Sequence, residues 1–531
     1  MKFAAALCVL PAIFVVACGG GGSESSNSNN SQTVTIQGKV TYDFVPHTSG
    51  GALDYNNTSR RPVPSARIQL LDSDGNTLDG SSTDADGNYQ AEVPANAEVR
   101  VRVLAQFDSQ FANISVTDNT RGNALYVLDG ELRNSGNSNS NRDLHAASGW
   151  TGSGYGNERA AAPFAILDSV YQAVKLVQTA DSNVSLPALE MRWSVNNIAV
   201  VSQNAASGRI GTSKFDGTNI FILGHEDNDT DEYDRSVIQH EFGHYLERTL
   251  FRLDSEGGRH SRRDQLDSRV AFSEGWSNAF AAMASSSTTY QDSMRKAQAS
   301  GFRYSLENNT IANLGWYSEN SVSQIVYDIY DSDSDSSDNI SLGFTPIYQA
   351  MRSDEYRRGT AVTNIYSFTD ALKNRLPIND AGAIDDLMEA NDIFGTGPFG
   401  IGETNNGGQS ISLPVYHELS VGAKVNLCSD KVPQVFNGIG VRRLVRLNIS
   451  QNDDYTIRAE KTRGRINTNP NMRIYRNGSQ ILELDSSVVD IESRDDVQLD
   501  AGDYLIELFD LNNMTFGSNP GGLSCFDLSI N

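Results

Sequence analysis

The feature that most constrains the fold is the spacing of the apolar residues, which changes twice along the chain. Between residues 33 and 107, apolar and polar positions alternate in short runs, beginning with Val34 and Ile36. Asp-Gly turns such as Asp74-Gly75 separate these runs. A period of two that is broken by such turns indicates antiparallel β-strands. We therefore predict a β-sandwich over residues 33–130.

A helical spacing begins after Glu158, where Phe164, Leu167 and Val174 fall on one face of a helix. Strand-like segments follow, and then further segments with a helical pattern; these lie at residues 189–193, 219–223, 234–251, 272–283 and 321–330. Strands followed by paired helices favour an α+β domain, which we place at residues 158–420. The Asn- and Ser-rich stretch 131–157 is predicted to be a surface connection.

Alternation returns beyond residue 421 and predicts a second β-sandwich over residues 421–531. The predicted fold class is therefore a multidomain protein with a β-sandwich on each side of a central α+β domain. Cys428 and Cys525 both lie in the last region. In an exported chain such a pair is expected to form a disulfide, and two unrelated buried thiols are the alternative.

The amino-terminal segment indicates export. Lys2 precedes an apolar stretch of about 14 residues, which is too short to span a membrane but is typical of a secretory signal, placed at residues 1–17. The run that ends at Cys18 resembles a bacterial lipobox. This resemblance implies a lipid on Cys18, a flexible tether over 18–32 and an anchored protein, with Gly19 resembling an outer-membrane address. An ordinary signal peptide with an incidental cysteine is the alternative.

The net charge of the chain limits the classes of molecule that it is expected to bind. A formal net charge of −24 argues against a nucleic-acid partner, because phosphate binding needs a basic surface. Two acidic runs, at residues 226–232 and 331–335, place carboxylates at alternate positions, as Ca²⁺ sites do. The second run has Ser336 where an EF-hand needs glycine. Solvated loops are the preferred interpretation of both runs, Ca²⁺ binding is the alternative, and we expect a monomer.

The strongest chemical signal is His-Glu-Phe-Gly-His at residues 240–244. Two histidines four apart on a helix share one face, so both can reach one metal ion with Glu241 beside them. Catalytic zinc usually takes three protein ligands and keeps one position open. The longer histidine signature is absent, because Glu247 and Leu250 stand where it needs glycine and histidine. Glu274, in a later segment with a helical pattern, is the candidate third ligand.

This motif, followed by Glu274-Gly275-Trp276-Ser277, resembles the gluzincin metallopeptidases, and within them the fungalysin and thermolysin-like groups. The resemblance covers residues 160–400 at most and implies a zincin-like catalytic domain. It implies that His240, His244 and Glu274 bind Zn²⁺ and that Glu241 is the general base, with a protein or peptide as substrate. Asn278 falls where these families carry an aspartate; its amide can still accept a hydrogen bond from His240, but without the charge.

Such families also place a histidine or tyrosine beside the oxyanion. Tyr317 is the candidate here, with His260 and His417 as rivals. The expected function is that of a zinc metalloendopeptidase that acts on extracytoplasmic proteins. A surface lipoprotein that has lost activity and serves in binding or adhesion is one alternative. An aminopeptidase, which would cleave only at free amino termini, is another.

Both flanking β-regions carry further resemblances. Gly38-Lys39-Val40 and the segments 64–70 and 83–89 resemble carboxypeptidase-regulatory-like domains, which accompany many secreted enzymes. Residues 500–507 resemble the final hairpin of the prepeptidase C-terminal domains found behind bacterial secreted peptidases. The first of these regions carries no catalytic residue, so the catalytic expectation rests on the central domain.

Overall fold

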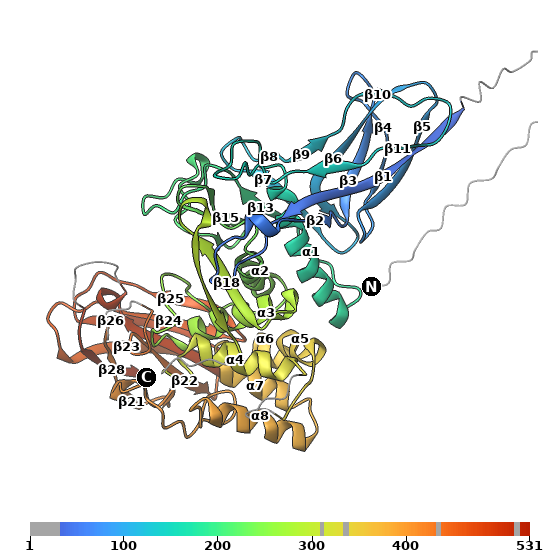
Figure 1. Ribbon diagram of the computed structural model, residues 1–531. Helices are drawn as coiled ribbons and strands as arrows, with labels where there is room; N and C mark the ends of the chain where they lie inside the picture. The colour runs from blue at the N-terminus through green and yellow to red at the C-terminus, as the bar shows by residue number, and fades with distance from the viewer. Residues whose placement is uncertain (1–31, 308–312, 333–338, 432–436, 515–520) are drawn as a thin grey trace, which may run out of the picture.

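The computed structural model describes residues 32–307, 313–332, 339–431, 437–514 and 521–531. The chain folds into several domains and is mostly β-structure with few helices. Figure 1 shows the amino-terminal strands at the upper right, the helices in the middle and the carboxy-terminal strands at the lower left. The predicted signal segment, Cys18 and the tether up to residue 31 lie outside the described residues. Among the residues that are described, no helix has the length and apolar character needed to cross a membrane.

The amino-terminal domain has two sheets whose buried residues join one core. In the first sheet, β1 (Thr33–Phe44) pairs with β2 (Ser59–Pro62), β5 (Asn88–Pro94), β11 (Ser140–Asn141) and β12 (Leu144–Ala146). The second sheet contains β3 (Ala66–Leu71), β4 (Thr77–Ser82), β6 (Glu98–Asp108), β9 (Val127–Asp129) and β10 (Arg133–Asn134). Val34, Ile36 and Val40 of β1 are buried at alternate positions, as a period of two predicts.

Residues 131–157 are not the surface connection that their composition predicts. They contain β10, β11 and β12, and the last two pair in parallel with β1. Polar side chains complete this pairing: the backbone N–H of Thr35 donates to Asn139 Oδ1 at 2.9 Å, and that of Lys39 donates to Asp143 Oδ1 at 2.8 Å. Asn and Asp can satisfy backbone groups at a sheet edge as readily as they face water, so composition alone was misleading.

The second sheet continues into the helical region. β7 (Asn113–Asp118) pairs with β6, with β8 (Ala124–Leu125) and, in parallel, with β13 (Leu189–Trp193). Beyond β13 lie β15 (Ile220–Ile222) and then β14 (Lys214–Phe215) at the edge. Helix α1 (Ala162–Ala180) packs against β6 and β7. The predicted boundary between the first sandwich and the central domain therefore crosses one continuous sheet.

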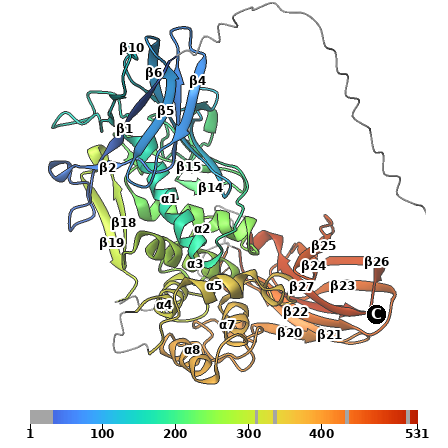
Figure 2. The same cartoon turned by 90° about the vertical axis from the view of Figure 1, so that its right-hand side faces the viewer.

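Helices α2 (Arg235–Thr249) and α3 (Ser268–Ser285) pack against each other and carry the two motifs. A Cβ on Gly243 would lie 3.0 Å from Ser277 Cα, so the glycine lets α2 approach α3 closely. Figure 2 shows this pair between the sheet and the remaining helices. Those are α4 (Glu319–Tyr330), α5 (Phe344–Arg352), α6 (Asp354–Arg358), α7 (Ile365–Lys373) and α8 (Ile378–Ala390).

Two small hairpins complete the central region. The first is formed by β16 (Gly224–His225) and β17 (Asp229–Thr230), immediately before α2. The second is formed by β18 (Thr289–Met294) and β19 (Ser300–Ser305), which follow α3. Contacts between β17 and β18 bring the two hairpins together, although they are about sixty residues apart in the sequence.

The carboxy-terminal domain is a separate sandwich with its own core. One sheet has the order β20 (Tyr416–Leu419), β22 (Arg442–Ile449), β27 (Gly502–Asp510), β24 (Pro470–Arg476) and β25 (Ser479–Leu484). The other has the order β21 (Lys424–Ser429), β28 (Ser524–Ile530), β23 (Asp453–Gly464) and β26 (Ile491–Leu499). Cys428 and Cys525 face each other across β21 and β28 and form the predicted disulfide.

Candidate metal centre

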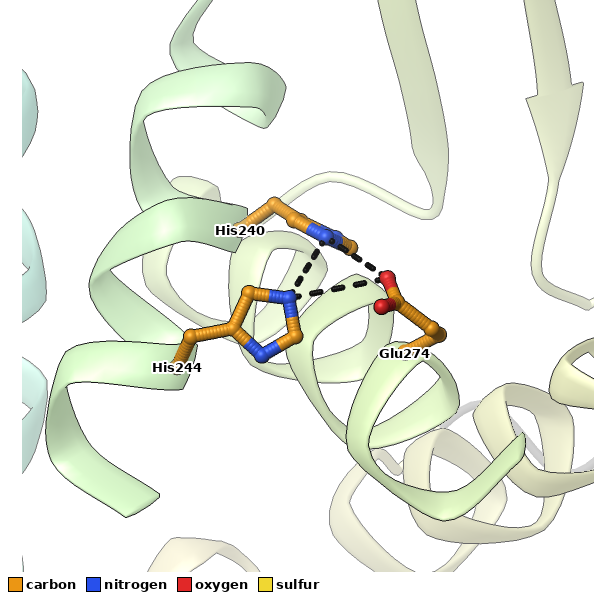
Figure 3. Close-up of side chains that lie close together, drawn as sticks. All are labelled: His240, His244 and Glu274. Carbon is orange, nitrogen blue, oxygen red and sulfur yellow. Dashed lines mark hydrogen bonds and ion pairs between the residues drawn. The ribbon is translucent and has the colours of Figure 1, made fainter. Parts of the chain in front are cut away.

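Three side chains from α2 and α3 converge at the middle of the molecule. Figure 3 shows His240 and His244 projecting from α2 toward Glu274 of α3. Glu274 Oε2 lies 3.2 Å from His240 Nε2 and 3.5 Å from His244 Nε2. The two Nε2 atoms are 3.1 Å apart. The helical repeat places both histidines on one face of α2, while α3, buried on nearly all sides, presents Glu274 to them.

The outer nitrogens of both imidazoles are held by oxygen atoms. His240 Nδ1 lies 2.9 Å from Asn278 Oδ1, the contact that the sequence predicts for this amide. His244 Nδ1 lies 3.1 Å from the hydroxyls of both Ser273 and Ser277, and 3.2 Å from Glu247 Oε2. The acceptors at Asn278 and Glu247 favour a proton on each Nδ1, which leaves each Nε2 lone pair facing the centre of the cluster.

The spacing of the donor atoms fits a tetrahedral zinc ion. Ligands about 2.0–2.2 Å from zinc at tetrahedral angles lie roughly 3.3 Å from each other, close to the three separations above. Glu274 is only 5% exposed, and its Oε2 accepts no hydrogen bond within the described part of the chain. Two nitrogen lone pairs and a carboxylate oxygen in such proximity are complementary to a cation. The residues present therefore fit a metal ion of the zinc type.

The electrostatics of the cluster follow from burial and from these short distances. Burial would raise the pKa of Glu274, but His244 and His260 outweigh it and lower this pKa well below its usual range. Burial would lower the pKa of His244, but Glu274 and Glu247 raise it well above its ordinary value. The carboxylate is thus held in its charged form, which is the form that binds a metal.

The Glu241 carboxylate is held by a backbone donor. Its Oε2 accepts the backbone N–H of Phe215 in the edge strand β14 at 2.7 Å. Burial raises the pKa of Glu241 above its usual value, despite the nearby His240 and His244. The raised pKa makes protonation of this carboxylate easier than that of an ordinary glutamate.

A cleft of about 1210 Å³ opens over this cluster and includes Glu241 in its lining. One wall is the β18–β19 hairpin, where the Tyr290 ring lies 6.3 Å from that of His240 and stacks on Tyr304. The loop between α2 and α3 supplies residues 255–262 to the lining, and its Arg262 guanidinium lies 3.3 Å from the centre of the Tyr304 ring. This volume is above the roughly 300–1,000 Å³ that is usual for small-ligand pockets.

The structure changes the choice of oxyanion donor. The hydroxyl of Tyr317 donates to Leu314 O and Asn405 Oδ1, each at 3.0 Å, and Tyr317 does not line the cleft. His417 belongs to β20, where its Nε2 lies 3.0 Å from the Arg443 guanidinium. The prediction for Tyr317 is therefore wrong, because an aromatic residue near a motif in sequence can still point into the core.

His260, the remaining rival, does reach the cluster. Its Nε2 lies 3.2 Å from Glu274 Oε2 and 3.5 Å from Glu319 Oε2 at the start of α4. Burial would lower the pKa of His260, but Glu274 raises it to about 10. Glu319 was not singled out from the sequence, and it is 3% exposed with a pKa raised by burial to about 7. No periodicity marks either residue, since one lies in a loop and the other in the first turn of a helix.

The first acidic run differs from its prediction as a solvated loop. Asp231 is 3% exposed and Glu232 is fully buried, with its carboxylate paired to Arg159. Asp229 and Asp231 approach Asp292 of β18 and form a second group of potential metal ligands. Most of the second acidic run, from residue 333 onward, lies outside the described residues.

Comparisons with known proteins assign no family. No family model matches the sequence, and no curated protein is similar to it. Among solved structures, the pre-peptidase C-terminal domain of a Bacillus anthracis collagenase matches 22% of this chain and 94% of its own, with 7% identity and a TM-score of 0.16. A periplasmic inhibitor of g-type lysozyme from Aeromonas hydrophila matches 22% of this chain and 97% of its own, with 13% identity and a TM-score of 0.15. A β-glucosidase from Paenibacillus barengoltzii matches 82% of this chain and 44% of its own, with 9% identity and a TM-score of 0.12.

Proposed function

We propose that this chain is a zinc-dependent peptidase whose centre is formed by His240, His244 and Glu274. The observation that carries the proposal is the convergence of two imidazole Nε2 atoms and one carboxylate oxygen, separated by 3.1–3.5 Å, in a cleft that also contains Glu241. Two histidines and a glutamate with an open fourth position are a ligand set of catalytic zinc. A structural zinc site would instead be closed by a fourth protein ligand.

The residues of the cleft divide the chemistry among them. When bound, the zinc ion supplies Lewis acidity, which polarises a carbonyl and lowers the pKa of a coordinated water. Glu241 takes the proton of the attacking water and passes it to the leaving amine, and the Phe215 N–H holds this carboxylate in position. Asn278 and Glu247 orient His240 and His244 through their outer nitrogens.

His260 is the group that we assign to the substrate oxyanion. It lines the cleft, and its Nε2 lies 3.2 Å from Glu274 Oε2, so it stands beside the centre without belonging to the tight three-atom cluster. Replacing an oxyanion donor typically lowers kcat by about 10²–10³-fold. His260→Ala should show this loss while the protein still holds one zinc ion per chain. Loss of zinc in this variant would instead make His260 a ligand.

The decisive experiment compares the purified protein with Glu241→Gln. We expect wild type to contain one zinc ion per chain by elemental analysis and to cleave casein in a reaction that 1,10-phenanthroline stops. Glu241→Gln should retain zinc and lose cleavage, because the amide cannot accept the proton. Glu389→Gln, which makes the same change at an exposed position on α8, should behave as wild type.

Two other outcomes separate the alternatives. Zinc binding without cleavage that depends on Glu241 would contradict the peptidase proposal and favour a surface lipoprotein that only binds its partner. Cleavage of peptides with a free amino terminus, but not of the same peptides after acetylation, would indicate an aminopeptidase.

We further propose an exported protein anchored by a lipid on Cys18. Mass spectrometry of the amino-terminal peptide from membranes would test this modification.

A further inference from the structure

Three carboxylates that do not belong to the proposed zinc centre lie close together in the lining of the cleft. Asp229 belongs to β17, Asp231 follows that strand directly, and Asp292 lies in β18 of the neighbouring hairpin. One carboxylate oxygen of each residue lies within 4.8 Å of the other two. All three residues line the same cleft as the candidate zinc ligands. The cluster therefore joins a segment that precedes α2 in the sequence to a segment that follows α3.

The three charges are not balanced by the protein. None of these aspartates forms an ion pair with a Lys, Arg or His in the described ranges of the chain. Asp231, at 3% exposure, accepts a hydrogen bond from Ser213 on Oδ2, while its buried Oδ1 has no donor among the described residues. The same holds for the buried Oδ1 of Asp292. A buried carboxylate oxygen without a donor is unfavourable unless a cation or a proton neutralises it.

Neutral hydrogen-bond donors hold some of these carboxylates in place without neutralising their charge. The Gln298 amide donates to Asp229 Oδ1 at 3.1 Å and to the Thr230 carbonyl at 3.0 Å. Asp234 lies close enough to add negative charge; its Oδ1 faces His47 Nε2, and both of its oxygens accept hydrogen bonds from Ser293. Burial, with Asp234 nearby, raises the pKa of Asp229 to about 6. Burial, with the charges of Asp229 and Asp292, raises that of Asp231.

We propose that Asp229, Asp231 and Asp292 form a second metal site, specific for a hard divalent cation of the Ca²⁺ type. The three offer only oxygen atoms, which hard cations prefer, whereas the His240, His244 and Glu274 set offers the nitrogen atoms that suit zinc. Asp229 and Asp292 are partly exposed to the cleft, which gives an ion an entry path and room for water ligands.

A cation at this site would link the segment before α2 to the β18–β19 hairpin. That hairpin carries Tyr290, whose ring faces His240 across the cleft at 6.3 Å. Bound Ca²⁺ would therefore fix a wall of the cleft and stabilise the fold, independently of whether zinc is present. This role goes beyond the proposed peptidase activity and does not depend on it.

The test uses the full-length protein, freed of Ca²⁺ on a chelating resin and resupplied with Zn²⁺. Calorimetric titration with CaCl₂ should show one ion per chain, and Asp292→Asn should weaken binding at least about tenfold. Asp227→Asn is the matched control. Asp227 lies in the same acidic run as Asp229 and Asp231 but is exposed, so its replacement should change the affinity for Ca²⁺ by less than about twofold. His244→Ala, which removes a proposed zinc ligand, should leave Ca²⁺ binding intact.

Thermal unfolding gives a second readout with opposite signs. Without Ca²⁺, Asp292→Asn should unfold at a higher temperature than wild type, because one of three repelling charges is gone. With saturating Ca²⁺ the order should reverse. Absence of Ca²⁺ binding by wild type, or equal weakening by Asp227→Asn, would overturn the proposal. So would an altered preference for Lys or Arg substrates in Asp292→Asn without any effect of Ca²⁺, which would make the cluster a substrate subsite.

Discussion

Helix α3 takes part in two buried clusters of charge that are built on opposite plans. At its start, Arg269 pairs with Asp267 at 2.8 Å and with Glu507 of the carboxy-terminal sandwich at 2.7 Å. Arg442 of β22 adds a second contact to Glu507 at 3.2 Å. About one and a half turns further along α3, Glu274 forms ion pairs with His240, His244 and His260. The first cluster pairs its carboxylates with arginines, whereas the second groups imidazoles around one carboxylate.

The arginines of the first cluster keep its carboxylates ionised. Burial would raise the pKa of Asp267, but Arg269 outweighs it and lowers the pKa to about 2. Arg269 likewise lowers the pKa of Glu507 against the effect of burial. The first cluster is neutral without any ligand and joins α3 to the sandwich. The second combines two imidazoles and a carboxylate at the spacing of a metal ligand set, which is why we propose it as a metal centre.

The largest loss of stability is expected from a substitution in the first cluster, where arginines and carboxylates pair with each other. Arg269→Met keeps most of the side-chain volume but leaves Asp267 and Glu507 buried without their main partner. Removing one member of a buried ion pair costs about 3–5 kcal/mol. We expect the free energy of unfolding in urea to fall by this amount. Arg458→Met, at a partly exposed position of β23, is the control, and a loss below about 1 kcal/mol for Arg269→Met would show that the cluster is not structural.

The features of the fold that depend on local sequence patterns could be predicted from the sequence. The strands of both sandwiches, the helices that carry His240 and Glu274, and the disulfide could all be inferred from local patterns. Gly243 lies inside α2, and the structure shows that its missing side chain lets α3 approach closely. These features are local because a strand, a helix or a cysteine pair is determined by spacing along the chain.

The remaining features depend on contacts between distant segments. Nothing near Arg269 in the sequence indicates Glu507, which is brought to it by the docking of a whole sandwich. His260 lies in a loop without periodicity, and Asp292 comes from a hairpin that only tertiary packing places beside Asp231. The continuity of the sheet from β6 through β7 to β13 was missed for the same reason, because strand pairing across α1 leaves no local signal.

Metal removal should affect only the second cluster. If the purified protein holds zinc at about 100–1,000 times its dissociation constant, stripping the ion lowers stability by about 2.7–4.1 kcal/mol. We therefore expect 1,10-phenanthroline to lower the unfolding temperature of wild type. Glu274→Gln, which lacks one ligand, should respond little.

A matched variant at the first cluster completes this test. Asp267→Asn should start from a lower stability, because Asp267 pairs with Arg269, but should respond to the chelator as wild type does. An equal response of Glu274→Gln and wild type would show that the chelator acts elsewhere, and the assignment of Glu274 as a ligand would then be wrong.

A smaller effect is expected where α2 meets α3. Gly243→Ala places a Cβ 2.9 Å from Ser277 Oγ and 3.0 Å from Ser277 Cα, which requires the two helices to move apart. Overpacking costs about 1–3 kcal/mol, and the better helix propensity of alanine returns about 1 kcal/mol. We expect a net destabilisation of about 1–2 kcal/mol in urea unfolding, with weaker zinc binding as the ligands separate. Unchanged zinc affinity would mean that the spacing of the helices does not determine the spacing of the ligands.

The smallest predicted effect concerns the partner of His240. Asn278 Oδ1 lies 2.9 Å from His240 Nδ1, and Asn278→Asp would replace a neutral acceptor by a charged one in the same position. A carboxylate makes the imidazole a stronger ligand, and partners of this kind typically change metal affinity by 10–100-fold. Because Asn278 is 6% exposed, the added charge also costs desolvation, so we expect the lower end, about tenfold tighter zinc binding.

Competition with a chromogenic zinc chelator would measure this change directly. Asn278→Ala serves as the opposite control, since it removes the acceptor and should weaken binding. The order Asp, Asn, Ala in decreasing affinity would show that this position tunes the metal through His240. If Asn278→Asp bound zinc more weakly than wild type, the buried charge would outweigh the gain in basicity, and the amide would be the better partner in a cluster that already contains Glu274, Glu241 and Glu319.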